Sequence, residues 1–126
     1  MMPVVEPEEA RLRSITSADF LKAFGKVKWT STRRRMLEVH LRSRDCTLSA
    51  EDMARGMGWE SYGTANANYG KLAGIICENL DISRSAVFYN LSVLVTMTQP
   101  SLGEEGEVMW TLRPAAVPAF TLYGQG

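Results

Sequence analysis

Two helical patterns joined by a short connection stand in residues 48–80, LSAEDMARGMGWESYGTANANYGKLAGIICENL. Ser49 and Asp52 have the spacing of a capping box, in which each side chain accepts the backbone N–H of the other residue. Gly58 stands where a left-handed residue ends a helix. The stretch therefore predicts a short helix that starts at Ser49 and ends at Gly58, and a second helix soon after it.

The second helix is expected over residues 63–80. Its inward face carries apolar side chains at helical spacing: Ala65, Tyr69, Leu72, Ala73, Ile76 and Leu80. Its outward arc holds small residues and two charges: Gly63, Ala67, Gly70, Lys71, Gly74 and Glu78. A glycine weakens a helix by about 1 kcal/mol relative to alanine, so something other than helix propensity selects these positions. The small residues either let a partner approach closely or let the helix pack on the protein's own hairpin or first helix.

Two more helices are expected before this pair. Thr16 and Asp19 have capping-box spacing and predict a helix over residues 16–25. A longer helix is expected over residues 29–44, with threonine and serine as possible N-caps. Its apolar face includes His40, which we interpret as a core histidine rather than a catalytic one.

From Val87 the period changes to alternation, which is typical of strands. One strand is expected over residues 87–98 and another over residues 107–113, joined by a turn over residues 100–106. A short helix is expected around residues 119–123. Together the elements predict an α+β, mostly α fold of the winged helix-turn-helix type. It would have a three-helix core, a β-hairpin wing and short extra helices at both ends.

Composition places the chain among globular proteins. The 126 residues are 45% hydrophobic and 22% charged, which is ordinary for one folded domain. Residues 1–10, with three glutamates and two prolines, are expected to be a flexible acidic tail, and residues 11–126 a single winged-helix-like domain. No apolar run approaches the ~20 residues that span a bilayer. The start of the chain also lacks the order of a secretory signal. We therefore expect a cytoplasmic protein with two free thiols, Cys46 and Cys77.

The charges are unevenly distributed although the net charge is zero. Residues 11–44 hold ten basic and two acidic residues, whereas residues 45–126 hold four basic and nine acidic residues. The basic part can attract a polyanion or an acidic protein face. Equally, its arginines can form a solvated helix face paired with Glu38. The glutamates of the expected wing, Glu104, Glu105 and Glu107, would repel a phosphate chain, so either the wing points away from DNA or the partner is not DNA.

Two stretches carry a resemblance to a known family. They are residues 54–73, ARGMGWESYGTANANYGKLA, and residues 110–114, WTLRP. Together they resemble a bacterial winged-helix-like module associated with the non-catalytic part of HNH-type restriction endonucleases and with stand-alone proteins of mobile elements. The resemblance is specific over these stretches and looser over residues 30–122. It implies recognition of nucleic acid or of another component, with the nuclease elsewhere. His40 has no histidine or asparagine partners at the required spacing, so nuclease activity is not implied here.

The expected function is recognition without catalysis, because no metal-ligand cluster, phosphate-binding glycine loop or cofactor motif is present in the sequence. DNA is the first candidate partner, bound through the helix over residues 63–80 and the arginine-rich helix over residues 30–44. Asparagine can pair with adenine, and arginine or lysine with guanine or phosphate. The candidate nucleic-acid-binding residues are Arg33, Arg34, Arg35, Arg42, Thr64, Asn66, Ala67, Asn68, Gly70 and Lys71.

A protein partner is the alternative. Three features fit an adaptor or inhibitor that acts on a nuclease or on a defence complex: the acidic wing, the zero net charge, and the small residues on the outward arc of the helix over residues 63–80. A homodimer is also compatible with the sequence. No membrane partner is expected.

Overall fold

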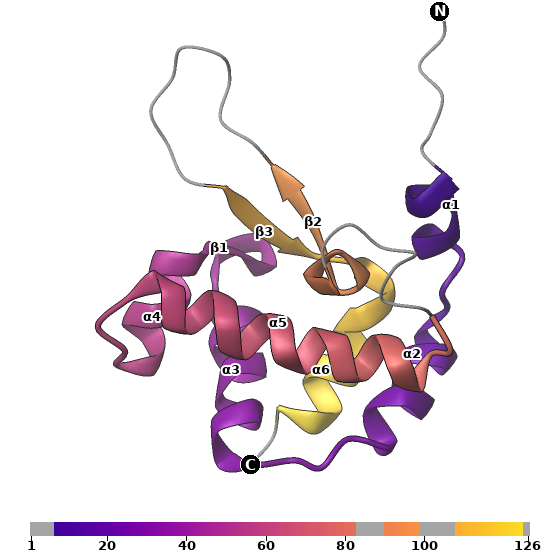
Figure 1. The fold of residues 1–126 in the computed structure, drawn as a ribbon, viewed down its shortest axis with the longest axis horizontal. Coiled ribbons are helices and arrows are strands. Elements are labelled where there is room, and N and C mark those ends of the chain that lie inside the picture. The colour runs from indigo at the N-terminus through magenta and orange to yellow at the C-terminus, as the bar shows by residue number, and fades with distance from the viewer. Residues whose placement is uncertain (1–6, 83–89, 99–107, 125–126) are drawn as a thin grey trace, which may run out of the picture.

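A computed structural model describes residues 7–82, 90–98 and 108–124 of the chain (Figure 1). Helices dominate it, and one small antiparallel sheet completes it. The expected mostly helical α+β class is confirmed. The α-helices are α1 (Pro7–Arg13), α2 (Ser17–Gly25), α3 (Ser31–Arg42), α4 (Ala50–Met57), α5 (Tyr62–Asn79) and α6 (Val117–Tyr123). The strands are β1 (Thr47–Ser49), β2 (Val95–Thr98) and β3 (Met109–Leu112), and the short 3-10 turns are η1 (Arg44–Cys46), η3 (Asn90–Val93) and η4 (Pro114–Ala116).

The helix ends follow the capping signals of the sequence. The Thr16 hydroxyl accepts the Asp19 N–H at 3.1 Å and the Asp19 carboxylate accepts the Thr16 N–H at 2.9 Å, which completes the capping box of α2. Ser49 and Asp52 form the same reciprocal pair at the start of α4, at 3.1 Å each. Gly58 ends α4 with a φ of 76°, a conformation that glycine adopts without steric cost. These predicted boundaries are confirmed.

The sheet has the order β1–β3–β2, with both pairings antiparallel. Trp110 of β3 lies opposite Leu48 on one side and Met97 on the other. The Thr47 and Thr111 hydroxyls also meet across β1 and β3, at 2.9 Å. The strand β1 was not expected from the sequence. It joins the end of α3 to the start of α4, so the sheet is tied directly to the helices.

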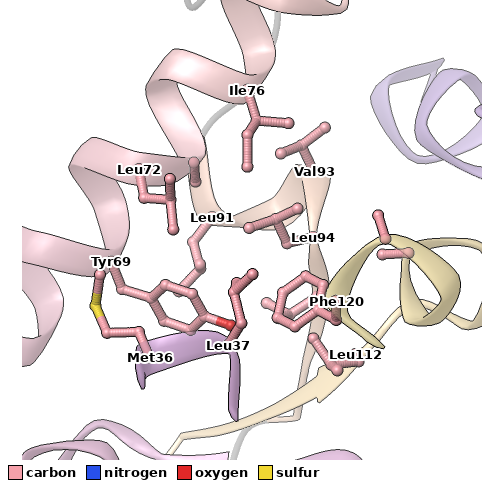
Figure 2. Close-up of a cluster of buried hydrophobic side chains, with 14 of the residues drawn as sticks. Met36, Leu37, Tyr69, Leu72, Ile76, Leu91, Val93, Leu94, Leu112 and Phe120 are labelled. Carbon is pink, nitrogen blue, oxygen red and sulfur yellow. The ribbon is translucent and has the colours of Figure 1, made fainter. Parts of the chain in front are cut away.

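The core gathers where α3, α5, α6 and the segment before β2 meet (Figure 2). Tyr69 and Leu72 of α5 lie on this side with Leu37 of α3 and Phe120 of α6, all of them buried. The five predicted inward residues of α5, other than the half-buried Leu80, are buried as expected. Burial of this apolar face fixes the rotation of α5 and decides which of its side chains reach the surface.

Three expectations need correction. Residues 7–10, expected in the flexible tail, are part of α1. Residues 90–93, expected in a strand, form the turn η3: the Leu94 N–H donates to the Leu91 carbonyl at 3.0 Å, and the adjacent Val93 and Leu94 are both buried instead of alternating between two faces. Gly74, expected on the outward arc of α5, is buried, since the carboxyl half of α5 is covered on more than one side. Residues 1–6, the first residues of the expected strand (87–89), the turn over 100–106 and the three wing glutamates lie outside the described residues.

Candidate recognition surface

The amino-terminal half of α5 presents an exposed face of small and polar residues. It consists of Tyr62, Gly63, Thr64, Asn66, Ala67 and Lys71. The Ser61 hydroxyl caps this end of the helix by accepting the Gly63 N–H at 3.0 Å. Tyr62 stands out because it is large and 58% exposed. We call this set the α5 face.

Two further predicted residues of α5 lie at the border of this face. Asn68 is half-buried, and its side-chain amide donates to the Thr64 carbonyl at 2.9 Å within the same helix. Gly70 is half-buried, and a Cβ built on it would meet nothing within 4 Å. The space over Gly70 is therefore not filled by the described part of the protein. With Gly74 buried, the small-residue strip is open only over the amino-terminal half of the helix.

The first two candidate arginines of α3 serve the fold. Arg33 donates through Nη1 to the Lys28 carbonyl at 2.7 Å. Arg34 donates through Nη1 to the Tyr123 carbonyl at 3.0 Å, and its guanidinium lies 5.9 Å from the centre of the Trp29 ring. Cationic donors to carbonyls are stronger than neutral ones. The Arg34 side chain thus contacts the carboxyl end of α6.

The other two candidate arginines share a carboxylate. Glu38 lies 3.8 Å from Arg35 and 3.2 Å from Arg42, as i,i+3 and i,i+4 pairs on α3. Both arginine side chains remain accessible, at 57% and 78% exposure. Exposed pairs of this kind contribute little to stability. Their geometry matches the solvated, ion-paired face that was the alternative to a phosphate contact.

A cavity that sequence reasoning missed lies beside the α5 face. Its volume is about 720 Å³, and it lies between α5, the start of α4 and the sheet. Tyr62, Asn66 and Gly70 line one wall, and Met97 and Trp110 line the other. Among the described residues that line it, Glu51 is the only charged one. Only the open position at Gly70 could have hinted at it in the sequence. We call this cavity the α5–sheet groove.

His40 and Tyr69 form a buried polar link behind the α5 face. The Nδ1 atom of His40 lies 2.5 Å from the Tyr69 hydroxyl, and Nε2 lies 3.1 Å from the Trp110 carbonyl. A carbonyl only accepts, so Nε2 carries the proton and Nδ1 accepts from Tyr69. Burial lowers the pKa of His40 to about 4, which keeps the ring neutral. The interpretation of His40 as a satisfied core histidine is confirmed.

Other features bear on the chemistry available to the chain. In residues 7–82, 90–98 and 108–124, no group of three or more histidine, cysteine, aspartate or glutamate side chains could hold a metal ion. Over the same residues, no helix is long and apolar enough to cross a membrane. Neither Cys46 nor Cys77 forms a disulfide, and the Cys77 thiol donates to the Asn90 carbonyl at 3.8 Å. Trp29 donates its indole N–H to the Phe24 carbonyl at 2.9 Å, as expected of a core anchor.

Comparison with known proteins gives no match to this chain, whether with protein-family models, with curated proteins or with solved structures.

Proposed function

We propose that this chain is a winged helix-turn-helix module that binds duplex DNA and uses α5 as its recognition helix. The order of the elements supports the proposal: α3, β1, α4, α5, β2 and β3 follow one another, and β3 pairs with both other strands. In helix-turn-helix proteins the second helix of the pair enters the major groove, and its amino-terminal residues contact base edges. In this proposal α4 and α5 form that pair, and the role is recognition without catalysis.

The observation that carries the proposal is the exposed α5 face. Thr64, Asn66 and Lys71 offer hydrogen-bonding groups suited to base edges and phosphates. Gly63 and Ala67 add little bulk between them, which favours close approach to a groove. The resemblance to modules associated with HNH-type restriction endonucleases agrees with this role. Under the proposal, Asn66 reads a base, and Lys71 contacts a base or a phosphate.

A gel-shift series on random duplex DNA at rising salt tests this function. The logarithm of the affinity is expected to fall linearly with the logarithm of salt, with a slope near 0.9 per phosphate contacted. Lys71→Ala is expected to weaken binding and reduce the slope by about one. Lys28→Ala, which removes an exposed lysine from the α2–α3 connection, is the matched control and leaves the slope unchanged. Absence of binding at ~50 mM salt would rule the function out.

A protein partner is the second candidate function, and the α5–sheet groove favours it. One wall of the groove includes the apolar side chains of Met97 and Trp110, and the other includes the exposed Tyr62. Aromatic residues beside such pockets commonly anchor protein interfaces. A partner here would insert an apolar side chain beside Gly70, in keeping with an adaptor or inhibitor of another complex.

A capture experiment separates the two functions. A protein partner is expected to be retained after nuclease treatment and to be lost with Gly70→Leu, which fills the groove, but not with Leu122→Ala on α6. Capture that disappears with nuclease, or that ignores Gly70→Leu, would contradict docking in the groove.

A further inference from the structure

A second cavity, at the carboxyl end of α5, is lined by basic side chains. Its volume is about 290 Å³. Arg11 reaches it from α1, Lys22 and Lys26 reach it from α2 and its border, and residues 79–82 close it at the end of α5. The three basic residues are exposed, and no salt bridge to them is found among the described residues, although the charge of Lys22 helps to lower the pKa of Asp19. They differ in this from Arg35 and Arg42, which share Glu38.

Two carboxylates also line this cavity, and their placement sets its charge. Asp19 accepts the Thr16 N–H at 2.9 Å as part of the α2 capping box. Hydrogen bonding from Thr16 lowers the pKa of Asp19, so this carboxylate stays ionised. Asp81 lies on the opposite side, just after α5. Three basic and two acidic groups leave a net charge of one positive unit, which matches a phosphodiester rather than a phosphate dianion.

The end of a helix carries negative partial charge, which would oppose an anion here. In α5 this charge is reduced by hydrogen bonding. Leu80 and Ile82 donate their N–H groups to the Ile76 and Cys77 carbonyls, both at 2.9 Å, and Asp81 donates to the Glu78 carbonyl at 3.1 Å. The Asn79 side chain donates to the Ala23 carbonyl at 3.0 Å and fixes this end of α5 against α2. This contact fixes α2, which carries Lys22, beside the end of α5.

The cavity and the α5 face lie at different points along the same helix, and their separation can be compared with the width of a DNA groove. Lys71 and Asn79 are eight positions apart, or about 12 Å at the rise of an α-helix. The major groove of DNA is about 12 Å wide. A helix whose amino-terminal half lies in the groove thus brings its other end to a bordering phosphate chain. Figure 1 shows α2 beside this end of α5, with α1 on the same side of the molecule.

We infer that Arg11, Lys22 and Lys26 form a phosphate-binding site that holds the DNA backbone while α5 occupies the groove. This inference rests on the proposed function and deepens it. It assigns phosphate contact to a cluster at the α1–α2 end of the protein, in place of the arginines of α3.

The test compares two double variants in the salt series on duplex DNA. Lys22→Gln with Lys26→Gln is expected to reduce the salt slope by about two and to lower affinity at least tenfold at ~100 mM salt. Arg35→Gln with Arg42→Gln removes two exposed charges from α3 and is expected to leave the slope nearly unchanged. Duplex binding with an unchanged slope in the lysine variant overturns the inference and leaves the proposed function standing.

A second arm applies if the protein binds no duplex, which would overturn the proposed function itself. Inorganic phosphate is then titrated while backbone amide signals are followed by NMR. Shifts confined to residues near Arg11, Lys22 and Asn79, and lost in the lysine variant, would support a phosphate site that takes a free phosphate ligand. Absence of such shifts would overturn the phosphate site as well.

Discussion

At the residue scale, the His40–Tyr69 pair links three elements through one buried imidazole. His40 comes from α3, Tyr69 from α5, and the Trp110 carbonyl from β3. Burial also raises the pKa of Tyr69 well above its usual value, so its hydroxyl remains a donor. Each polar atom of the link is satisfied, and such buried networks are stabilising only when every member is paired.

Tyr69→Phe tests this link. The change leaves Nδ1 of His40 buried without its donor, and a stability loss of about 1–3 kcal/mol is expected. Urea unfolding followed by circular dichroism measures it. Tyr62→Phe removes the same hydroxyl from an exposed ring and is expected to change stability by less than about 0.5 kcal/mol. Equal effects of the two changes would contradict the role given to the buried hydroxyl.

The same histidine predicts a pH dependence of stability. Its pKa is about 4 in the folded protein and 6.5 in the unfolded chain. Between these values the unfolded chain binds the additional proton, so stability is complete above pH 6.5 and falls as the pH drops toward 4. The loss is expected to reach about 3 kcal/mol. His40→Gln, which can donate to Trp110 and accept from Tyr69, should flatten the profile over this range. A variant profile parallel to that of the unmodified protein would refute the assignment.

At the element scale, two glycines of neighbouring helices differ in whether they leave space for a side chain. A Cβ at Gly70 of α5 meets nothing within 4 Å, whereas a Cβ at Gly56 of α4 would lie 2.6 Å from a methyl group of Val39. Gly70→Ala is therefore expected to raise stability by about 0.5–1 kcal/mol through helix propensity. The same change at Gly56 is expected to lower it, because Val39 must move. Thermal unfolding measures both.

The Gly70 variant also bears on function. If α5 approaches a partner closely at this position, Gly70→Ala gains stability and loses affinity for duplex DNA. A variant that gains stability with unchanged affinity would show that the space over Gly70 is not used in binding.

Local signals were sufficient to predict α2, α4 and α5, although not the start of α1. The capping pairs Thr16–Asp19 and Ser49–Asp52 and the left-handed Gly58 act over a few residues, so the sequence alone places the ends of α2 and α4. The inward face of α5 was predictable for the same reason, because its apolar spacing is regular. Helix identity and orientation are local properties in this chain.

Features that depend on distant residues were not predictable. β1 has three residues and exists through its pairing with β3, whose partner residues lie 60 to 64 positions away. The sequence made Arg34 a candidate nucleic-acid contact, but its side chain donates to the Tyr123 carbonyl, which lies 89 positions further along the chain. The α5–sheet groove and the cavity lined by Arg11, Lys22 and Lys26 can be predicted only when the positions of several elements are known. Tertiary contacts, which the local pattern does not encode, decide all of these.

At the scale of the whole molecule, α6, the last helix, closes the core by packing against α2 and α3. Phe120 is fully buried, with its ring 5.6 Å from that of Phe24 in α2 and 6.0 Å from the His40 ring in α3. The Tyr123 ring is stacked on Trp29 at 5.3 Å. The final helix therefore joins α2 and α3. One core thus supports both α2, beside the second cavity, and α5, which carries the α5 face.

This arrangement predicts that the described elements unfold together. Phe120→Ala is expected to lower stability by about 3–5 kcal/mol, since it removes a large side chain from the centre of the core. Leu122→Ala, on the same helix but 56% exposed, is the matched control and should change stability by less than about 0.5 kcal/mol. Far-ultraviolet circular dichroism follows the helices, and near-ultraviolet circular dichroism or tryptophan fluorescence follows the packing around Trp29, Trp59 and Trp110. Coincident transitions are expected in both variants, because one core supports all these elements. If the tryptophan signal were lost at lower denaturant than the helical signal, the described elements would not unfold as one unit, which would contradict a single core.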